Sequence, residues 1–472
     1  MLTFDTLYAW VKDLPILDWH NHLDMRMLAE DKPLGSLYEV WVKSDPYKHR
    51  AMRICGEPER LITGDAPEDE KWAAWRGTLP KLVGNPIFAW AEQELAFLRG
   101  TGNGERGTGS SGWWRDLENV SLADWTPSKM LAKFGVEYMS PCVGAGELGS
   151  LEVGKSGSSD GTASKPLNLQ PSNPPTLQTS NPLNFETSKP LNFHPSIVPS
   201  LRMNAGDVVP EETLEKFHAA GCRVVDVSVD DVSQLIAFSS QDSTHNAQLP
   251  TTNCQLPTIA AYAASHGWTM LLHLGALRET SARLRAAAGA AGGFAGMRAP
   301  VDPAAVAAFL NGLESLQNCF SHRENSTRST RSTRLNNPVN PVNPVQNSLP
   351  RTVLMSLNPE AHAQLAVLAG SFNGEGMPGK VQLGPAWWWC DHEEGIRDVL
   401  EKNAAYGVLS TFIGMTTDSR SLLSFVRHDY FRRILCKWVA EKVAAGVFPS
   451  DEALLRPTLE NVCYRNAERI IK

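Results

Sequence analysis

Two histidines, His20 and His22, stand two residues apart in the run DWHNH and could share one metal ion. On an extended chain, side chains two residues apart point to the same side, so both imidazoles could reach one cation. Asp418, at the end of the run LSTFIGMTTD, could add a carboxylate. Two imidazoles and one carboxylate leave coordination positions open for water or substrate. Asp418 could equally cap the helix that follows it.

Eight short apolar or β-branched runs bounded by breaking residues could be the strands that carry these side chains. They are Pro15–Trp19, Gly135–Ser140, Ser196–Leu201, Cys222–Val229, Thr269–Leu274, Thr352–Leu357, Lys380–Leu383 and Val408–Gly414. Helical patterns lie between most of them, including Glu212–Ala220, Ala304–Leu316, Pro359–Leu368 and Gly395–Ala405.

This alternation predicts an α/β fold, a (β/α)8 TIM-like barrel with helical additions and low-complexity loop insertions. The first and eighth strands of a closed barrel are neighbours, so His20, His22 and Asp418 could converge at the carboxyl ends of the strands. The sequence therefore predicts a site for one divalent metal ion, which we expect to be zinc.

Further polar and aromatic residues follow other predicted strands, where barrels of this kind place their chemistry. An arginine there suits an anionic substrate, because its planar guanidinium can donate two hydrogen bonds at once. Each arginine could instead form a surface ion pair, and the histidine of this set could be a core residue. A run of three tryptophans cannot face inward throughout, so at least one is expected to line a pocket or loop. The residues in question are Arg202, His273, Arg278, Arg420 and the run Trp387, Trp388 and Trp389.

A long helix is predicted after the last strand, because SLLSFVRHDYFRRILCKWVAEKV places apolar residues at helical spacing. We expect its basic residues Arg427, His428, Arg432 and Arg433 to form a solvated or ion-paired face, although they could contact substrate.

Tandem repeats interrupt the barrel pattern. An octad runs four times from Ser164, a heptad runs twice within 244–257, and the triplets STR and NPV fill 326–345. Such Pro-, Asn-, Ser- and Thr-rich segments cannot bury a core, so they are expected to be loop insertions rather than solenoid turns or peptide ligands. We therefore expect residues 1–472 to form a single barrel domain, with a helical excursion at about 31–130 and insertions at about 147–195, 239–258 and 322–349.

Composition narrows the class of protein. The 472 residues carry a net charge of −7, and the arginines of the STR triplets lack interleaved aromatic residues, so we expect no nucleic-acid partner. We find neither a secretory leader nor an apolar run of membrane-spanning length, and the eight cysteines are scattered without a CxxC pair. We expect a cytoplasmic enzyme of a small molecule, with no membrane partner; a homo-oligomer is left open.

Several segments resemble the uronate isomerases, a family of the amidohydrolase superfamily of metal-dependent (β/α)8 barrels. They include DWHNHL, LLHLGALRETSAR, GSFNGEGMPGKVQLGPAWWWCDHEEGI and FIGMTTDSRSLLSFVRHDYFRRILC. The resemblance implies interconversion of D-glucuronate with D-fructuronate and of D-galacturonate with D-tagaturonate. It also implies roles for matching residues: metal ligation by His20, His22 and Asp418; catalysis by Asp418, Tyr47, His273 and Arg420; substrate binding by Arg202, Arg278 and either Trp387 or Trp388.

The chain departs from the family pattern near the expected site. Pro46 stands where the family usually has a histidine, and Ser140–Gly144 replaces an acidic, threonine-rich turn. Val227 replaces another histidine, and Glu279, Thr280 and Ser281 replace asparagines. These changes keep open a hydrolase or decarboxylase of another small acid. Two further alternatives are a non-haem iron oxygenase, which also uses two histidines and a carboxylate but which the barrel pattern disfavours, and an inactive barrel that serves as a binding module.

Overall fold

The structure, a computed structural model, describes residues 2–100, 113–114, 117, 120–148, 195–239, 253–278, 280–289, 292–316, 349–374 and 376–471. Most of the three expected insertions, and Glu279, lie outside the described residues.

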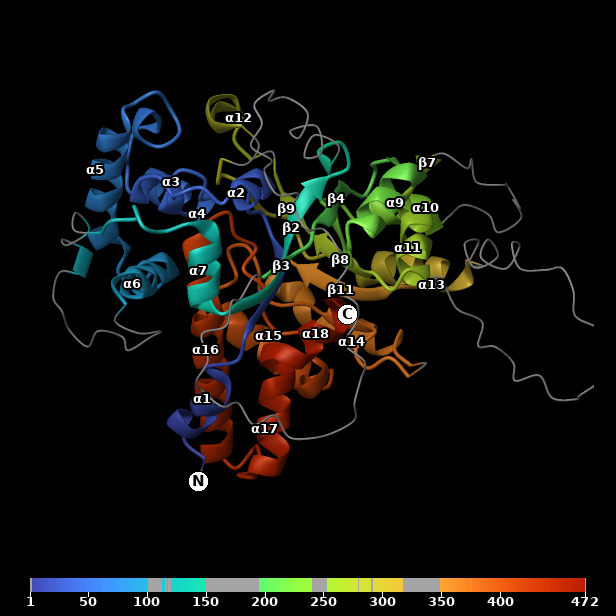
Figure 1. The fold of residues 1–472 in the computed structure, drawn as a ribbon. Coiled ribbons are helices and arrows are strands. Elements are labelled where there is room, and N and C mark those ends of the chain that lie inside the picture. The colour runs from blue at the N-terminus through green and yellow to red at the C-terminus, as the bar shows by residue number, and fades with distance from the viewer. Residues whose placement is uncertain are drawn as a thin grey trace, which may run out of the picture.

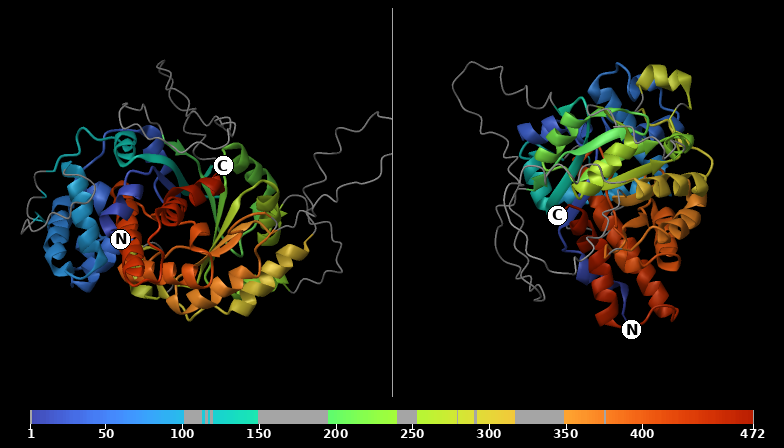
Figure 2. Two further views of the ribbon diagram at one scale, coloured as in Figure 1. Left: turned by 90° about the horizontal axis from the view of Figure 1, so that it is seen from below. Right: turned by 90° about the vertical axis from the view of Figure 1, so that its right-hand side faces the viewer.

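A curled sheet of parallel strands forms the centre of the molecule (Figures 1 and 2). Its main path runs through β1 (Ile16–Asn21), β2 (Val136–Gly144), β4 (Ser200–Asn204), β6 (Val224–Val229), β8 (Thr269–Leu274), β11 (Arg351–Ser356) and β12 (Val381–Leu383). Strands such as β1, β6 and β8 are buried along their whole length, as expected for a parallel sheet covered by helices. The prediction of a TIM-like α/β fold is confirmed, with these seven strands forming a half-barrel.

One predicted strand is divided in two. Ser196–Leu201 becomes β3 (Ser196–Ile197), which pairs with β2, and β4, which begins at Ser200. Pro199 lies at the break and has no N–H to donate to a ladder.

The predicted eighth strand, Val408–Gly414, is wrong. It contains the 3-10 turn η5 (Leu409–Thr411), and residues 412–418 form no regular ladder. Gly414 and Asp418 have φ values of 79° and 49°, which are incompatible with extended backbone.

The segment nevertheless lies beside the first strand. The Asp418 N–H donates to the His20 carbonyl at 3.2 Å, and the His22 N–H donates to the Ser419 carbonyl at 2.8 Å. On the other side, the Ile413 N–H donates to the Gln382 side chain at 2.8 Å. Irregular backbone therefore joins β12 to β1 and brings Asp418 to the two histidines.

Helices cover the outer face of the sheet (Figure 2). The four predicted helices are confirmed as α9 (Glu211–Ala219), α13 (Pro303–Ser315), α14 (His362–Gly370), which follows η4 (Pro359–Ala361), and α15 (Glu393–Ala405). The structure also contains α10 (Ser233–Ser239), α11 (Leu256–Ser265) and α12 (Ala282–Ala288). Two short antiparallel pairs join β5 (Val209–Pro210) to β7 (Asn253–Cys254) and β9 (Ala276–Leu277) to β10 (Gly296–Met297).

A group of helices connects β1 to β2 and projects to one side of the barrel (Figure 1). It comprises α2 (Met25–Glu30), α3 (Leu37–Trp41), α4 (Pro46–Ile54), η1 (Glu59–Leu61), α5 (Glu68–Thr78), η2 (Leu79–Leu82), α6 (Pro86–Arg99) and α7 (Pro127–Phe134). Helix α4 begins with Pro46 at its first position, and the Asp45 carboxylate accepts from the Tyr47 and Lys48 N–H groups. This cap fixes the direction in which Tyr47 enters the site.

Helices α16 (Val426–Ala444), which follows η6 (Leu422–Phe425), and α17 (Glu452–Glu460) pack against α1 (Phe4–Val11) on the side of the barrel away from α12 (Figure 1). The π-turn η7 (Asn461–Arg465) and α18 (Asn466–Ile471) follow, and α18 contacts β1.

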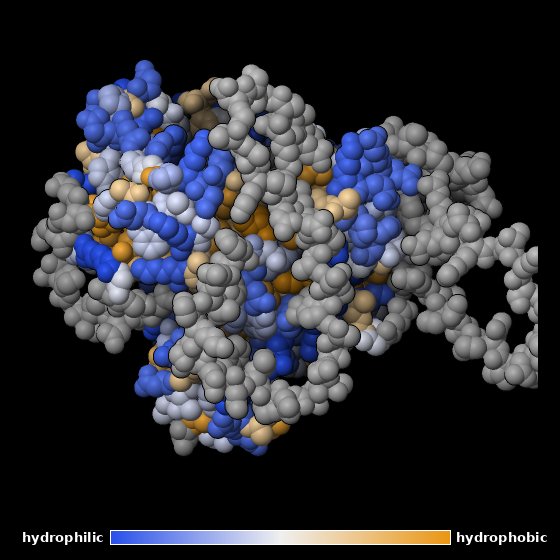
Figure 3. Space-filling model, in the orientation of Figure 1, coloured by the Kyte–Doolittle hydropathy of each residue, from blue (hydrophilic) through white to orange (hydrophobic). Residues whose placement is uncertain are grey.

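The apolar face predicted for the helix after the last strand is confirmed in α16, but three of its basic residues are not solvated. Arg427, His428 and Arg432 are buried and bind acidic side chains or backbone carbonyls. No helix of the described chain is both long and apolar enough to cross a membrane. In Figure 3 the outer helices are mostly hydrophilic, and apolar residues gather between them toward the sheet.

Candidate metal centre and substrate site

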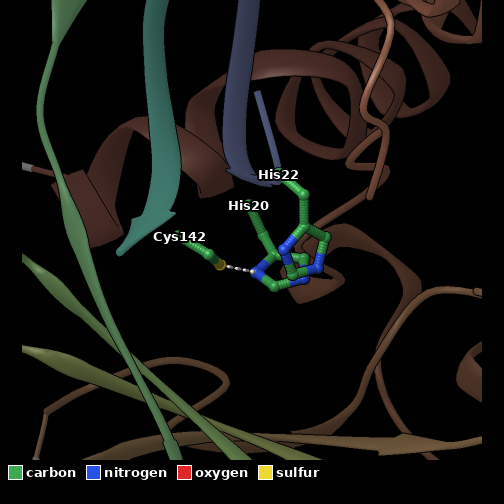
Figure 4. A group of neighbouring side chains, drawn as sticks. All are labelled: His20, His22 and Cys142. Carbon is green, nitrogen blue, oxygen red and sulfur yellow. Dashed lines mark hydrogen bonds between the residues drawn. The ribbon is translucent and has the colours of Figure 1, made fainter. Parts of the chain in front are cut away.

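Two imidazoles meet one carboxylate at the carboxyl end of β1. The Nε2 atoms of His20 and His22 lie 3.0 Å and 3.1 Å from the same oxygen, Oδ1 of Asp418. Figure 4 shows both histidines at the end of β1, with Cys142 of β2 directed at the other side of the His20 ring. The three residues predicted as metal ligands therefore converge, although their sequence positions differ by almost 400.

A buried carboxylate beneath this cluster holds the turn that carries Asp418. The Asp18 carboxylate accepts from the Thr417 N–H and hydroxyl, both at 2.7 Å, and from the Thr416 hydroxyl at 2.9 Å. The Asp18 carboxylate also contacts His428 of α16, whose Nε2 lies 3.2 Å from Oδ1 of Asp18. Asp18 is completely buried, so it acts on the site only by fixing neighbouring residues.

The donor set fits a divalent metal ion. Zinc binds imidazole nitrogen and carboxylate oxygen at about 2.0–2.2 Å, so two ligand atoms at a tetrahedral angle are about 3.3 Å apart. The separations of 3.0 Å and 3.1 Å are close to that value. Burial lowers the pKa of His22 to about 4, so its ring is neutral at pH 7, as a ligand must be. For His20, burial is outweighed by Cys142, Asp226 and Asp418, which raise its pKa well above the usual value, so a metal ion would displace a proton from that ring. Burial alone would raise the pKa of Asp418, but the two histidines hold that pKa well below its usual range.

Asp226, at the centre of β6, links the metal cluster to two predicted site residues. Its carboxylate lies 2.7 Å from Nδ1 of His273, pairs with Arg202, and lies 3.9 Å from Nδ1 of His20. The Cys142 thiol is directed at the same carboxylate at 3.4 Å. Within the described chain, two overlapping groups bring three donor atoms within 4.8 Å of one another: His20 with His22 and Cys142, and His20 with Asp226 and His273. Asp418 is in neither group, so its oxygen lies close to each imidazole without completing such a triad.

His273 has unused hydrogen-bonding capacity although it is buried. Its Nδ1 is close to Asp226 but not aligned for a hydrogen bond, and Nε2 has no partner among the described residues. Burial lowers the pKa of His273, so the ring is neutral at pH 7. Such an unsatisfied buried group needs an explanation, and a bound ion or substrate is one.

The predicted substrate-binding residues surround this core. The Arg278 side chain binds Asp230 at 2.9 Å and the Ser228 hydroxyl at 2.6 Å. Trp387 lies edge-on to His273, with ring centroids 4.4 Å apart, whereas Arg278 lies over the Trp388 ring at 5.7 Å. Trp387 is thus the indole nearest the catalytic histidine candidate.

Arg420 differs from the other two arginines. It is exposed, and among the described residues it forms no ion pair. Its charge contributes to lowering the pKa of His22, after burial and against the pull of Asp418, so it lies close to the metal cluster.

Tyr47 belongs to a cluster that sequence reasoning missed in part. Its hydroxyl donates to Asp391 at 3.0 Å, and Arg427 of α16 donates to the same oxygen at 3.0 Å. Trp389 lies edge-on to the Tyr47 ring at 4.9 Å. Asp391 stands two residues after the tryptophan run, with Cys390 between them, which is the one signal that could have drawn attention to it.

Backbone conformation also singles out this region. Among the described residues, four that are not glycine have positive φ, and three of them are Trp388, Trp389 and Asp418. Non-glycine residues in this conformation are strained and cluster at functional sites. The fourth, Asp31, ends helix α2.

A cavity at the opposite end of the barrel is a poorer candidate. It measures about 530 Å³ and is lined by the ends of α14 and α15 and the start of β12. Among the described residues, no acidic, basic or histidine side chain lines it, and its Asn373 and Gln382 already bind backbone groups. The titratable groups of the molecule converge instead at the carboxyl ends of the strands.

A parallel barrel-type sheet with histidines, carboxylates and arginines at the carboxyl ends of its strands defines an enzyme of the (β/α) barrel class. The model of the glucuronate isomerase family matches residues 3–322 and 324–471. A uronate isomerase from Caldicellulosiruptor bescii is 31% identical over 484 aligned positions, which cover 99% of this chain and 96% of that protein. The chain belongs to the glucuronate isomerase family, and it is an isomerase.

Solved structures agree with the fold. A uronate isomerase from Thermotoga maritima superposes with a TM-score of 0.69 at 22% identity, covering 99% of this chain and 97% of that chain. A glucuronate isomerase from Caulobacter crescentus gives a TM-score of 0.68 at 17% identity, covering 99% and 93%.

Proposed function

We propose that this isomerase interconverts D-glucuronate with D-fructuronate and D-galacturonate with D-tagaturonate. The observation that carries the proposal is the convergence of His20 and His22 on Asp418, beside the neutral His273 and the unpaired Arg420. The resemblance of these positions to the family motifs supports the same assignment.

The reaction needs a base, hydrogen-bonding groups for the two oxygens that change between hydroxyl and carbonyl, and a group that binds the uronate carboxylate. A proton leaves the carbon next to a carbonyl, and the resulting enediol returns a proton to the neighbouring carbon. A divalent ion held by His20, His22 and Asp418 supplies polarisation of substrate oxygens. The free oxygen of Asp418 is our assignment for the base.

The remaining residues divide the other tasks. The Tyr47 hydroxyl and the unpaired Nε2 of His273 are suited to hydrogen bonds with the oxygens that change between hydroxyl and carbonyl. Arg420 is suited to the uronate carboxylate, because no carboxylate of the described residues forms an ion pair with it. We assign Arg202 and Arg278, together with Trp387 and Trp388, to the sugar hydroxyls and ring face.

Three finer assignments accompany this proposal. We assign zinc as the ion, because imidazole, carboxylate and thiol donors lie within reach of one another. Residues 1–472 form one barrel domain that carries its helical excursion and insertions as additions. The enzyme works in the cytoplasm, where the free thiols found at the described cysteines are the rule.

A coupled assay of the purified protein with D-glucuronate and D-galacturonate tests the function, with and without chelator. Asp418→Asn should reduce turnover by about 100-fold or more, because it removes the proposed base and a metal ligand. Asn tolerates positive φ, so the fold should survive. Asp31→Asn is the matched control, since Asp31 has a φ of 44° outside the site.

The outcomes separate the remaining alternatives. Ketose formation that the chelator and Asp418→Asn abolish, and that Asp31→Asn leaves intact, supports the isomerase and its metal site together. A protein that binds one metal ion but forms neither ketose would refute the assignment of these two uronates as its substrates. Elemental analysis of the purified protein identifies the metal.

A further inference from the structure

A buried hydrogen-bonded chain connects Tyr47 to the turn that carries Asp418. Tyr47 comes from α4, Asp391 from the segment between β12 and α15, and Arg427 from α16. Oδ2 of Asp391 accepts from the Tyr47 hydroxyl and from Nη1 of Arg427, each at 3.0 Å. The same Nη1 lies 3.3 Å from the Thr417 carbonyl, immediately before Asp418. These hydrogen bonds therefore join α4, the segment before α15, and α16.

Packing leaves the Tyr47 ring little freedom. Trp389 and Trp90 meet it edge-on, with centroids 4.9 Å and 5.6 Å away. The Arg427 guanidinium lies 5.0 Å from the Tyr47 ring centre and 4.1 Å from that of Trp90. Because Tyr47, Asp391 and Arg427 are 8%, 7% and 2% exposed, water does not compete for their hydrogen bonds.

The phenol is held neutral, and its proton is already engaged. Burial and the charge of Asp391 raise the pKa of Tyr47 well above its usual value. Burial also raises the pKa of Asp391, while Arg427 opposes that effect. The charge of Asp418 also raises the pKa of both groups, which agrees with the contact of Arg427 with the Thr417 carbonyl beside Asp418. A phenol whose proton points at Asp391 presents its oxygen lone pairs to the rest of the site.

We propose that Asp391 is a positioning residue that acts through Tyr47, and that Arg427 fixes it there. Because Asp391 accepts the hydrogen bond of the Tyr47 hydroxyl, the Tyr47 oxygen can in turn accept a hydrogen bond from the sugar hydroxyl that becomes the ketose carbonyl. Arg427 holds this geometry in register with Asp418 through the Thr417 carbonyl. The inference rests on the proposed isomerase function.

Four enzymes test the role of Asp391: wild type, Tyr47→Phe, Asp391→Asn and the double variant. Asp391→Asn should lower kcat about 10- to 100-fold with little change in KM, because its amide can donate to Tyr47 and reverse the hydrogen bond. In the Tyr47→Phe background the same substitution should change kcat by less than about twofold, since its partner is gone. Asp398→Asn is the matched control. The Asp398 carboxylate also pairs with a neighbouring side chain, because it lies 2.7 Å from Nδ1 of His362, but it is not part of the site.

Equal losses from Asp391→Asn in both backgrounds would show that Asp391 acts independently of Tyr47, and wild-type kcat in Asp391→Asn would also overturn the proposal. If removing this charge leaves Arg427 buried without a counter-ion and the protein fails to fold, Asp391→Asn is combined with Arg427→Gln. That neutral pair is then compared with and without Tyr47→Phe, with the same expected dependence on Tyr47.

A readout without turnover separates this inference from the proposed function. The NMR resonance of the Tyr47 Cζ carbon, assigned by its loss in Tyr47→Phe, should move in Asp391→Asn and stay in place in Asp398→Asn. A resonance that Asp391→Asn leaves unchanged would overturn the inference. Wild-type protein that isomerises neither uronate would instead refute the proposed function, while the NMR result still reports on the hydrogen bond.

Discussion

Arg420 differs from Arg202 and Arg278 in that no carboxylate of the described residues forms an ion pair with it. Arg202 and Arg278 are paired with Asp226 and Asp230, so neither has a full guanidinium edge free for a substrate carboxylate. Arg420 is exposed near His22 and forms no ion pair within the described chain. Ground-state binding of an anion should therefore depend more on Arg420 than on the other two.

Arg420→Gln should raise KM for D-glucuronate about 10- to 100-fold, because a hydrogen bond to a charged group is lost. A rise in KM with kcat within a few-fold of wild type would indicate a contact made equally in the ground and transition states. Steady-state kinetics measure both constants. Arg223→Gln, at the amino end of β6, is the control.

An unchanged KM in Arg420→Gln would move the carboxylate to another arginine. A loss confined to kcat would instead make Arg420 a group that acts only in the transition state.

At the scale of elements, Asp18 of β1 fastens the irregular eighth segment to the first strand and to α16. Asp18→Asn would set an amide N–H₂ against the donors of Thr416 and Thr417. The free energy of unfolding of the metal-free protein should fall by about 3 kcal/mol, the usual cost of breaking a buried charged network. Metal affinity should fall about 10- to 100-fold, because the Asp418 turn is no longer held.

Urea denaturation and metal titration check these two effects of Asp18→Asn. Asp398→Asn, which removes the partly exposed Asp398 carboxylate of α15 from its contact with His362 of α14, should cost less stability and leave metal affinity unchanged. Equal behaviour of the two variants would mean that Asp18 has no special link to the metal centre.

The sequence predicted those elements whose pattern is local. Alternating breakers and apolar runs located the seven strands of the sheet, and the alternation of side chains along β1 paired His20 with His22. The eighth strand could not be recognised as irregular, because the positive φ of Gly414 and Asp418 depends on how the segment fits between β12 and β1.

Contacts between distant elements were equally out of reach. Helical spacing shows which residues share a face of α16. It does not show that Arg427 binds Asp391 or that His428 contacts Asp18. Cys142 lies near the carboxyl end of β2, in a segment whose residues depart from the family pattern, so the motif did not indicate its approach to His20.

At the scale of the molecule, the N-terminal helix and first strand pack against the C-terminal part of the chain. Helix α1 packs on α16 and α17, and the Tyr8 hydroxyl donates to Asp429, which Arg433 also binds at 2.8 Å. The first strand likewise depends on residues near 418 for its open edge. Loss of either end should therefore unfold the barrel as a whole, and global stability should register titration anywhere in the core.

Two buried histidines should make that stability sensitive to acid. Burial lowers the pKa of both His22 and His49 to about 4, against about 6.5 in an unfolded chain. Between those values the unfolded state binds a proton that the folded state does not, so stability falls as pH falls from about 6.5 and levels off near 4. For each histidine, the slope is at most about 1.4 kcal/mol per pH unit. Each histidine therefore contributes about 3 kcal/mol over the whole window.

His49 isolates this effect from the metal centre, because it lies on α4 with its Nε2 buried and unpaired among the described residues. In metal-free protein, His49→Gln should flatten the dependence of unfolding free energy on pH, measured by urea denaturation at pH 7, 6 and 5. His392→Gln, a part-exposed residue that caps α15, should keep the wild-type slope. Identical slopes in wild type and His49→Gln would mean that other groups carry the acid sensitivity, since the substitution removes the titrating ring and leaves the rest of the core in place.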